Sequence, residues 1–571
     1  MEDGDSVIAL PDSPEAFKEA TWQDVLPYYE ELAARPLDPS NVEAWLADWS
    51  SFEALIAEAR NLANFAYSCD TANPELEAAQ LRFGTDISPK AQEQRVRLQA
   101  RLVDLGYERA GLEMMVRRIK NEMSLFREAN VQLSADVSRL TTEWAKVSGA
   151  MTVEWEGEEK TPAQLLPFLE STDRGVRERA FRLRAKPYIE QRETLAGLFD
   201  RMYDLRQQIG LNAGFKNFRD YIHQEKNRFD YTPADCLRFQ DAVETAVLPA
   251  VKRIHDRRRR QMGVDRLRPW DLNVDPKGRA ALQPFGDIAT LLDRARDIFG
   301  RVDPDFRGFF QKMEDARLLD LENRKGKAPG AYCDDLPYSK MPLIVMNAVG
   351  IDDDVRTLLH ESGHAFHCLE AVQLPLVFQR EYGAEIAEVA SMSMELLGAP
   401  FIDKDSGGYY SEADARRSRT ELLEGIVLFF PHCASVDAFQ QWMYTNPEGR
   451  DADARDRKWL ELRRRFEGDS VDWTGLDAQR IARWYQQPHF FSYPFYYIEY
   501  GLAQLGALQV WRNSLGDRSE AVRKYRQALA LGGTRPLPEL YQAAGARLIF
   551  DSQGMQELIS LVEEEMGKLT G

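Results

Sequence analysis

The segment His360-Glu361-Ser362-Gly363-His364 constrains this chain most, because its spacing has chemical meaning only on a helix. Residues four apart on an α-helix lie on the same face. His360 and His364 can therefore direct two imidazole nitrogens at one divalent metal ion. Glu361 projects about 100° round the helix from His360. Its carboxylate can then approach a water on the metal from the side without being a ligand.

The residues around this segment predict the helix that it requires. Asp352, Asp353 and Asp354 precede it, and acidic side chains at a helix start accept from free backbone N–H groups. We therefore predict a helix from about residue 354 to residue 372. Gly363 weakens such a helix by ~1 kcal/mol. We expect a glycine there because a side chain would crowd the approach to the metal.

Two imidazoles leave a metal ion under-coordinated, so a hydrolytic site needs a third protein ligand and an open position for water. His367 shares the face of His360 and His364. Its Cα, however, lies ~10 Å along the helix axis from that of His360. We therefore predict that His367 is a supporting or core histidine and not a ligand.

A carboxylate is the natural third ligand. The segment from Tyr382 to Leu397 predicts a helix on which Glu385, Glu388 and Glu395 share one face. Either Glu385 or Glu388 would be the ligand, and Glu395 would orient a ligating imidazole. The spacing alone does not choose between the first two.

Two short strands are predicted just before the metal-binding helix, at Ala331–Cys333 and Leu343–Asn347. Such an element beside a metal site can offer backbone groups to an extended peptide, which then adds as an extra strand. Alternatively, the strands form a small structural sheet over the helical core. The sequence leaves both interpretations open.

A second group of polar aromatic residues lies near the C-terminus. Its members are His489, Tyr496, Tyr497 and Tyr500. Ser492 and Pro494 predict a helix start among them. Phenol and imidazole donors beside a metal-bound carbonyl would stabilise the oxyanion of a tetrahedral intermediate. The alternative is an aromatic core cluster whose hydroxyls reach water.

Composition excludes some functions. The net charge of -19 argues against a general nucleic-acid or anionic-membrane binder, since both need a cationic surface. No run approaches the ~18 apolar residues of a membrane span. The start, Met1–Asp5, is acidic and no signal-peptide core follows it. Five scattered cysteines without Cys-x-x-Cys spacing predict reduced thiols and a cytoplasmic location.

The order of these motifs resembles oligoendopeptidase F, a branch of the thimet-oligopeptidase-like zinc metallopeptidases. The segments that carry the resemblance are Gly330–Cys333, Leu343–Asn347, His360–His364, Ala387–Ser391 and His489–Tyr500. The likeness runs from about Val153 to the C-terminus. It implies a mainly α fold: a two-lobed helical ellipsoid with a deep central channel and a small β-element beside the zinc helix. Residues 1–190 would form an N-terminal helical lobe and channel wall, and residues 191–571 the catalytic region.

The resemblance also implies roles for particular residues. Glu388 matches the third ligand of one zinc ion per chain, although manganese or cobalt can occupy such a donor set. His489, Tyr496 and Tyr500 match residues that contact substrate. Tyr497 stays a candidate for polarising the carbonyl, because the branches of the family differ there by one residue in spacing. The implied activity is hydrolysis of internal bonds in short unstructured peptides, with Glu361 as general base.

Three other functions compete with this one. A carboxypeptidase or dipeptidyl-carboxypeptidase would need a cation placed to bind the terminal carboxylate of the substrate. A non-catalytic peptide-binding protein would have no need of Glu361. A structural helical scaffold would need the helices but none of the candidate site residues that they carry.

Overall fold

The structure is a computed structural model that describes residues 8–570, so the acidic start at Met1–Asp5 lies outside the described residues. Within them the fold is mainly helical, with a two-stranded and a three-stranded sheet, which confirms the predicted fold class. The chain divides into two compact units, each assembled from three separate segments. The functional division at residue 190 stays a prediction.

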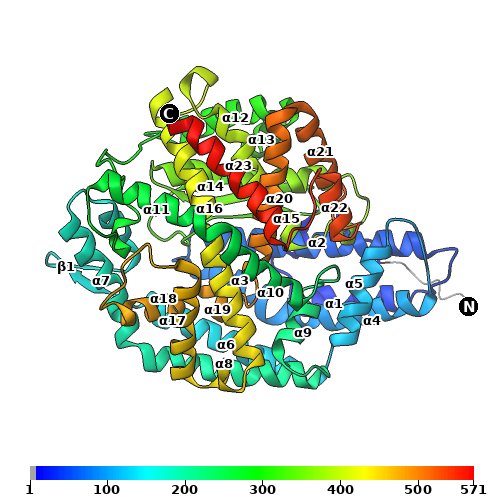
Figure 1. The fold of residues 1–571 in the computed structure, drawn as a ribbon. Helices are drawn as coiled ribbons and strands as arrows, with labels where there is room; N and C mark the ends of the chain where they lie inside the picture. Colours follow the sequence, from blue (N-terminus) through cyan, green and yellow to red (C-terminus); the bar gives the residue numbers. More distant parts are fainter. Residues whose placement is uncertain (1–7, 571) are drawn as a thin grey trace, which may run out of the picture. The chain divides into compact units, whose positions relative to one another are not determined.

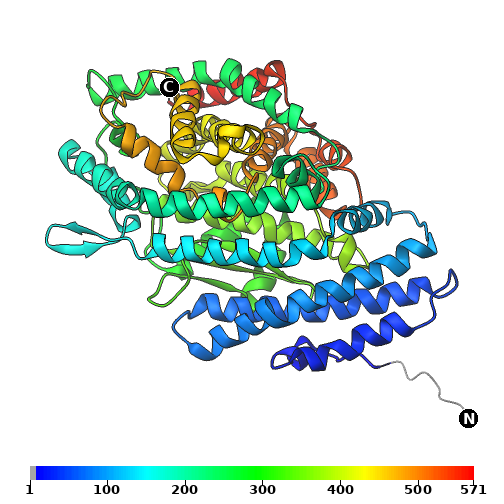
Figure 2. The same ribbon diagram turned by 90° about the horizontal axis from the view of Figure 1, so that it is seen from below.

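The first unit comprises Met1–Ser124, Gln283–Ala415 and Gly506–Arg547. Its main helices and strands are α1 (Trp22–Ala34), α2 (Val42–Cys69), α3 (Pro74–Arg82), α4 (Ser88–Leu105), α5 (Glu113–Leu125), α12 (Ile288–Val302), α13 (Pro304–Asp315), β3 (Leu319–Glu322), β4 (Tyr332–Leu336), β5 (Met341–Ala348), α14 (Asp352–Ala371), α15 (Ala384–Gly398), α21 (Arg518–Ala530) and α22 (Leu537–Ala543). Figure 2 shows α1, α2 and α4 in blue, running alongside one another. Buried aromatic side chains, Tyr29, Trp45, Trp49 and Phe52 among them, hold these helices together.

The three-stranded sheet of this unit lies against the helix that carries the His-Glu-x-x-His segment. Its strand order is β3-β5-β4, with β5 parallel to β3 and antiparallel to β4. Residues Leu343–Met346 of β5 are buried, as in a strand covered on both faces. Helix α14 packs against β5 and against α15 (Figure 1). The predicted β-element beside the metal-binding helix is thus confirmed.

Helix α14 starts at the aspartates that predict its beginning. The Asp354 carboxylate accepts hydrogen bonds from the backbone N–H groups of Val349, Gly350 and Ile351, at 2.8–2.9 Å. A buried carboxylate at this place satisfies donors that would otherwise be unpaired, and it favours the positive end of the helix dipole. These bonds fix the connection from β5 into α14 and hence the direction in which the metal-binding helix leaves the sheet.

The second unit comprises Leu125–Leu282, Arg416–Leu505 and Leu548–Gly571. Its main elements are α6 (Glu128–Gly149), β1 (Val153–Trp155), β2 (Glu158–Lys160), α7 (Arg174–Glu190), α8 (Arg192–Asn212), α9 (Phe218–Glu225), α10 (Pro233–Ala242), α11 (Leu248–Met262), α17 (Ala452–Glu467), α18 (Asp477–Tyr485), α19 (Pro488–Phe491), α23 (Ser552–Thr570) and most of α16 (Glu412–Thr445). Helix α16 is long and apolar enough to cross a membrane by length and composition alone. However, 72% of its apolar window is buried inside the protein, as in a core helix.

The helix expected from Ser492 and Pro494 begins later than predicted. The structure has α20 (Tyr497–Gly516), preceded by Phe495 with φ of 62°, a left-handed conformation that interrupts a helix. Tertiary contacts hold this turn, because Gln440 Oε1 accepts from the Phe495 N–H at 2.7 Å and Arg228 donates to the Phe495 carbonyl. Local sequence signals therefore misplace this helix start.

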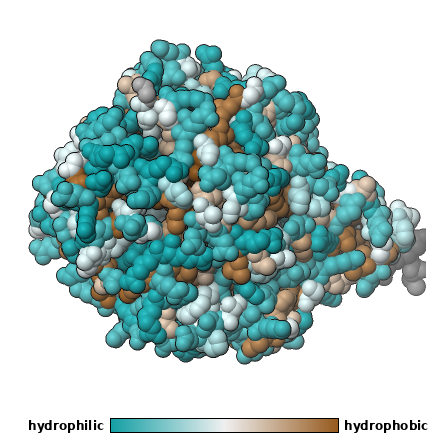
Figure 3. Space-filling model, in the orientation of Figure 1, coloured by the Kyte–Doolittle hydropathy of each residue, from teal (hydrophilic) through white to brown (hydrophobic). Residues whose placement is uncertain are grey.

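The surface and the cysteines agree with the composition. Hydrophilic residues predominate on the face shown in Figure 3, and hydrophobic residues form small separate groups there. The five cysteines are not joined by disulfides in the structure, and their reduced state stays a prediction. The cytoplasmic location stays a prediction.

Candidate functional site

Two helices bring three donor side chains together in the first unit. His360 and His364 come from α14, and Glu388 comes from α15. Glu388 Oε2 lies 3.4 Å from His360 Nε2 and 3.6 Å from His364 Nε2. One possible ligand atom from each of the three residues lies within 4.8 Å of the other two. Among the residues that the structure describes, these three side chains are grouped closely enough to hold a metal ion.

The spacing and charge of these donors fit a zinc-sized ion. Donors on a tetrahedral ion with bonds of about 2.0–2.2 Å lie about 3.3 Å apart, close to the separations between Glu388 and the two imidazoles. Burial opposes ionisation of Glu388, but its contacts with His360 and His364 lower its pKa to about 2. Burial lowers the pKa of His364 to about 4, which leaves a neutral imidazole. Burial opposes a charge on His360, but its hydrogen bonds to Glu388 and Glu395 raise the pKa of this imidazole well above its usual range. An ionised carboxylate and neutral imidazoles are the forms that bind metals, so metal binding would release a proton from His360.

Neighbouring groups hold each donor in place. His360 Nδ1 lies 2.7 Å from Glu395 Oε1, the contact expected of a carboxylate that orients an imidazole. His364 makes a hydrogen bond to the backbone of Ala387. Ser391 Oγ donates to Glu388 Oε2 at 2.9 Å. Sequence reasoning assigned no role to Ser391, although its spacing of three residues from Glu388 places both on one helix face.

The structure separates the two glutamates between which the sequence did not choose. Glu388 faces both imidazoles, whereas Glu385, one helical turn earlier, is buried outside the donor group. The rotation of α15 about its own axis, which is fixed by its packing against α14, determines which glutamate faces the histidines. Glu388, and not Glu385, therefore lies where a third ligand could complete the group with the two histidines.

Glu361 is buried beside the donor group and lies against the sheet. Glu361 is only 7% exposed to solvent. Burial raises the pKa of the Glu361 carboxyl to about 7. The nearby charge of Glu388 acts in the same direction, while His360 and a hydrogen bond to the backbone of Cys333 in β4 oppose it. A carboxyl with a pKa near 7 is suited to accept and return a proton at neutral pH.

The reason predicted for Gly363 is wrong. A Cβ atom at Gly363 would lie 2.6 Å from Ser391 Cα and 2.7 Å from the Ala390 carbonyl oxygen. Both atoms belong to the backbone of α15, so the glycine permits the close approach of α14 and α15. It is this approach that brings Glu388 to the two histidines.

We expect Gly363→Ala to lower the free energy of unfolding by about 1–3 kcal/mol, because the added methyl group forces two packed helices apart. Thermal unfolding with and without metal measures this. Gly308→Ala is the matched control, since Gly308 lies in α13 with no atom within 4 Å of the added Cβ. That control is expected to stabilise the protein by about 0.5–1 kcal/mol. Equal behaviour of the two variants would contradict the packing explanation.

His367 is a core histidine, as predicted. It is fully buried, and its ring stacks on Tyr382 with centroids 3.6 Å apart and planes 10° from parallel. Burial lowers the pKa of His367 to about 3, so the ring is neutral. It is not among the clustered metal donors.

The second unit gathers His489 and the three tyrosines into one aromatic cluster. The His489 ring centroid lies 4.8 Å from that of Tyr497, 6.0 Å from Tyr496 and 6.1 Å from Tyr500. Burial and the neighbouring charge of Lys226 lower the pKa of His489 to about 4. Burial raises the pKa of Tyr497 to about 12. His489 and Tyr497 are thus neutral hydrogen-bonding groups at neutral pH.

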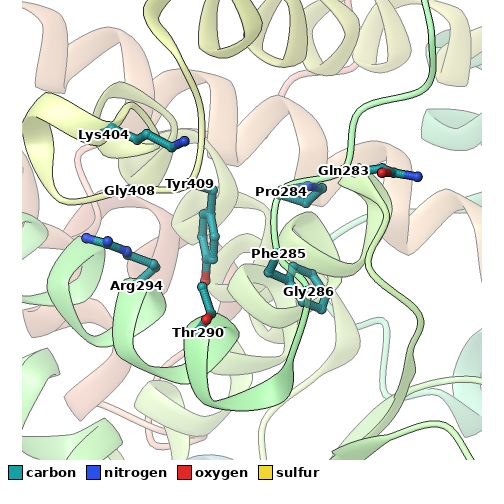
Figure 4. Close-up of a pocket in the computed structure, with 9 residues that line it drawn as sticks. All are labelled: Gln283, Pro284, Phe285, Gly286, Thr290, Arg294, Lys404, Gly408 and Tyr409. Carbon is teal, nitrogen blue, oxygen red and sulfur yellow. The ribbon is translucent and has the colours of Figure 1, made fainter.

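A separate cavity of about 430 Å³ opens elsewhere in the first unit. Its lining includes Phe285, Arg294, Lys404 and Tyr409, with the Tyr409 ring standing between the loop at Pro284 and helix α12 (Figure 4). None of the predicted site residues lines it. The cavity therefore does not belong to the donor group on α14 and α15.

Known proteins share both the fold and the sequence pattern. PZ peptidase A, in a structure with an inhibitor, matches 99% of each chain with a TM-score of 0.86 and 26% identity. The oligoendopeptidase F homolog of Borreliella burgdorferi is 22% identical over 457 residues, 76% of this chain and 73% of that protein. Oligopeptidase PepF of Bacillus subtilis is 21% identical over 425 residues, 72% of this chain and 60% of that protein.

A mainly helical fold with this donor group on two adjacent helices, together with these relatives, defines a metallopeptidase. Residues 168–559, more than half of the chain, match Peptidase family M3. The chain belongs to that family, in its oligoendopeptidase F branch.

Proposed function

We propose that the protein is a zinc-dependent endopeptidase that hydrolyses internal bonds of short unstructured peptides. The observation that supports this most directly is the convergence of His360, His364 and Glu388, with Glu361 buried beside them. These three residues would hold one zinc ion per chain. When bound, the ion would polarise a water molecule and the scissile carbonyl.

Glu361 is the proposed general base. Its carboxylate takes a proton from the attacking water as the water oxygen bonds to the carbonyl carbon. The same carboxyl group returns the proton to the amine nitrogen as the C–N bond breaks. The pKa of about 7 suits both transfers.

Strand β4 is the proposed docking edge for the peptide backbone. It lies at one edge of the described sheet, paired with β5 alone, and its Cys333 backbone contacts Glu361. At Asp335 the edge is already used, because Asn61 Nδ2 donates to the Asp335 carbonyl at 2.8 Å. A peptide added along the rest of this edge would pass beside the general base.

The aromatic cluster of His489, Tyr496, Tyr497 and Tyr500 is the proposed substrate-contacting group of the second unit. Neutral phenol and imidazole groups donate hydrogen bonds without adding charge, which suits a carbonyl oxygen that becomes negative in the transition state.

An internally cleavable peptide with an amidated C-terminus tests this function. We expect cleavage at an internal bond, seen in product masses, together with about one zinc ion per chain. A chelator should abolish the activity and added zinc restore it. Cleavage only of peptides with a free C-terminal carboxylate would instead favour the carboxypeptidase alternative. Zinc binding without any turnover would favour the peptide-binding alternative.

We expect Glu395→Gln to weaken zinc binding by about 10–100-fold, because carboxylates behind a ligating imidazole typically contribute that much. Competition with a chromogenic chelator measures the affinity. Glu385→Gln is the matched control, since it makes the same replacement at a buried glutamate on the same helix outside the donor group. An unchanged affinity in Glu395→Gln would contradict the orienting role of Glu395.

A further inference from the structure

A chain of hydrogen bonds runs from a buried arginine to His489 within the second unit. It starts at Arg463, whose Nη1 donates to His432 Nδ1 at 3.0 Å. A guanidinium group can only donate, so His432 Nδ1 is an acceptor. Burial and the adjacent Arg463 lower the pKa of His432 well below its usual range, so its ring is neutral. The proton of that ring must then be on Nε2.

The next step of the chain determines what the Tyr497 oxygen does. His432 Nε2 lies 3.2 Å from Tyr497 Oη, so the imidazole N–H donates to the phenol oxygen. Gln487 Nε2 donates to the same oxygen at 2.9 Å. Both acceptor positions of the hydroxyl are therefore used. Only the O–H of Tyr497 remains, as a donor.

The Gln487 amide also reaches His489. Its Nε2 lies 2.8 Å from His489 Nδ1, so a single amide group supplies one hydrogen to each of the two cluster residues. An imidazole that accepts at Nδ1 carries its proton on Nε2 when it is neutral. His489, half-buried beside Lys226, is such a neutral ring.

We propose that Gln487 is a positioning residue that makes His489 and Tyr497 a pair of hydrogen-bond donors. It fixes His489 as the Nε2–H tautomer and occupies the Tyr497 oxygen, so neither residue offers an acceptor. Two donors and no acceptor recognise a carbonyl oxygen and its oxyanion and reject a competing N–H group. The effect of Gln487 on catalysis rests on the proposed function. The tautomer of His489 does not depend on that function.

Nitrogen NMR of the full-length, zinc-loaded protein labelled with 15N-histidine tests the tautomer. The chain has seven histidines, and His489→Gln identifies the His489 signals by their loss. We expect an unprotonated Nδ1 and a protonated Nε2 for His489. In Gln487→Glu, an acceptor of the same shape, the proton should move to Nδ1. In Gln487→Met, which cannot bond to either residue, both tautomers should appear.

Peptide hydrolysis by the same variants tests the catalytic consequence. We expect Gln487→Glu to lower kcat by about 100-fold, the effect of losing one oxyanion donor. KM should change little, because the lost bond strengthens only in the transition state. Gln487→Met should lose less. Gln486→Glu is the matched control, since it adds the same charge one residue earlier, and it should keep the wild-type rate. Thermal unfolding verifies that each variant is folded.

Three results overturn this inference. His489 with its proton on Nδ1 in the wild-type protein excludes the proposed amide orientation, whatever the rates. An unchanged tautomer in Gln487→Glu excludes control by Gln487. A wild-type kcat in a Gln487→Glu protein whose tautomer has switched removes the catalytic role. By contrast, no hydrolysis by the zinc-loaded wild-type protein overturns the proposed function, and the NMR result still decides what Gln487 does.

Discussion

Glu361→Gln is expected to lower kcat for peptide hydrolysis by about 10²–10⁴-fold, the usual contribution of a general base. The amide has the shape of the carboxylate but cannot take a proton from water. His360, His364 and Glu388 are unchanged, so the variant should still bind about one zinc ion per chain. Single-turnover hydrolysis of a quenched peptide, with zinc measured on the same sample, separates the two effects.

Glu361→Asp is the companion variant, because it keeps the carboxylate but shortens the side chain by one methylene group. Its rate should fall between those of the wild-type protein and Glu361→Gln. Hydrolysis by Glu361→Gln at close to the wild-type rate would show that another group removes the proton. Loss of zinc from Glu361→Gln would make the variant uninformative about the base and would place Glu361 among the ligands.

Glu388→Ala is expected to weaken zinc binding by more than about 100-fold, beyond the range for groups that only orient a ligand. It should also abolish hydrolysis at limiting zinc. The physical reason is that two imidazoles alone give the ion too few protein ligands. They also lack the negative charge with which a carboxylate ligand partly neutralises the ion. Zinc affinity by chelator competition, followed by activity at saturating zinc, measures both consequences.

Glu385→Ala is the matched control, one helical turn away on α15. It should keep zinc affinity within a few-fold of wild type, because Glu385 lies outside the donor group. The reverse outcome, with zinc lost from Glu385→Ala and kept by Glu388→Ala, would show that α15 presents its other glutamate to the metal.

The two helices of the metal site could be predicted from sequence because their determinants are local. A helix from residue 354 to 372 was expected and α14 spans Asp352–Ala371. A helix over residues 382–397 was expected and α15 spans Ala384–Gly398. Periodicity and acidic residues at a helix start act within one or two turns, so they are visible in the sequence.

The helix start in the aromatic segment could not be predicted in the same way. Ser492 and Pro494 are favourable local signals, yet α20 begins only at Tyr497. Phe495 adopts a positive φ because Gln440 and Arg228, distant in sequence, bind its backbone N–H and carbonyl. Tertiary hydrogen bonds thus override a weak local preference.

The sequence by itself determined that one helix carries two imidazoles and a carboxylate in register, that a second offers several acids, and that both belong to a mainly helical protein. Only the tertiary structure decided which acid meets the imidazoles, why residue 363 has no side chain, and which amide holds His489. The difference is physical. Spacing along one helix follows from its fixed pitch, whereas the distance between helices depends on side chains that pack from far apart in the chain.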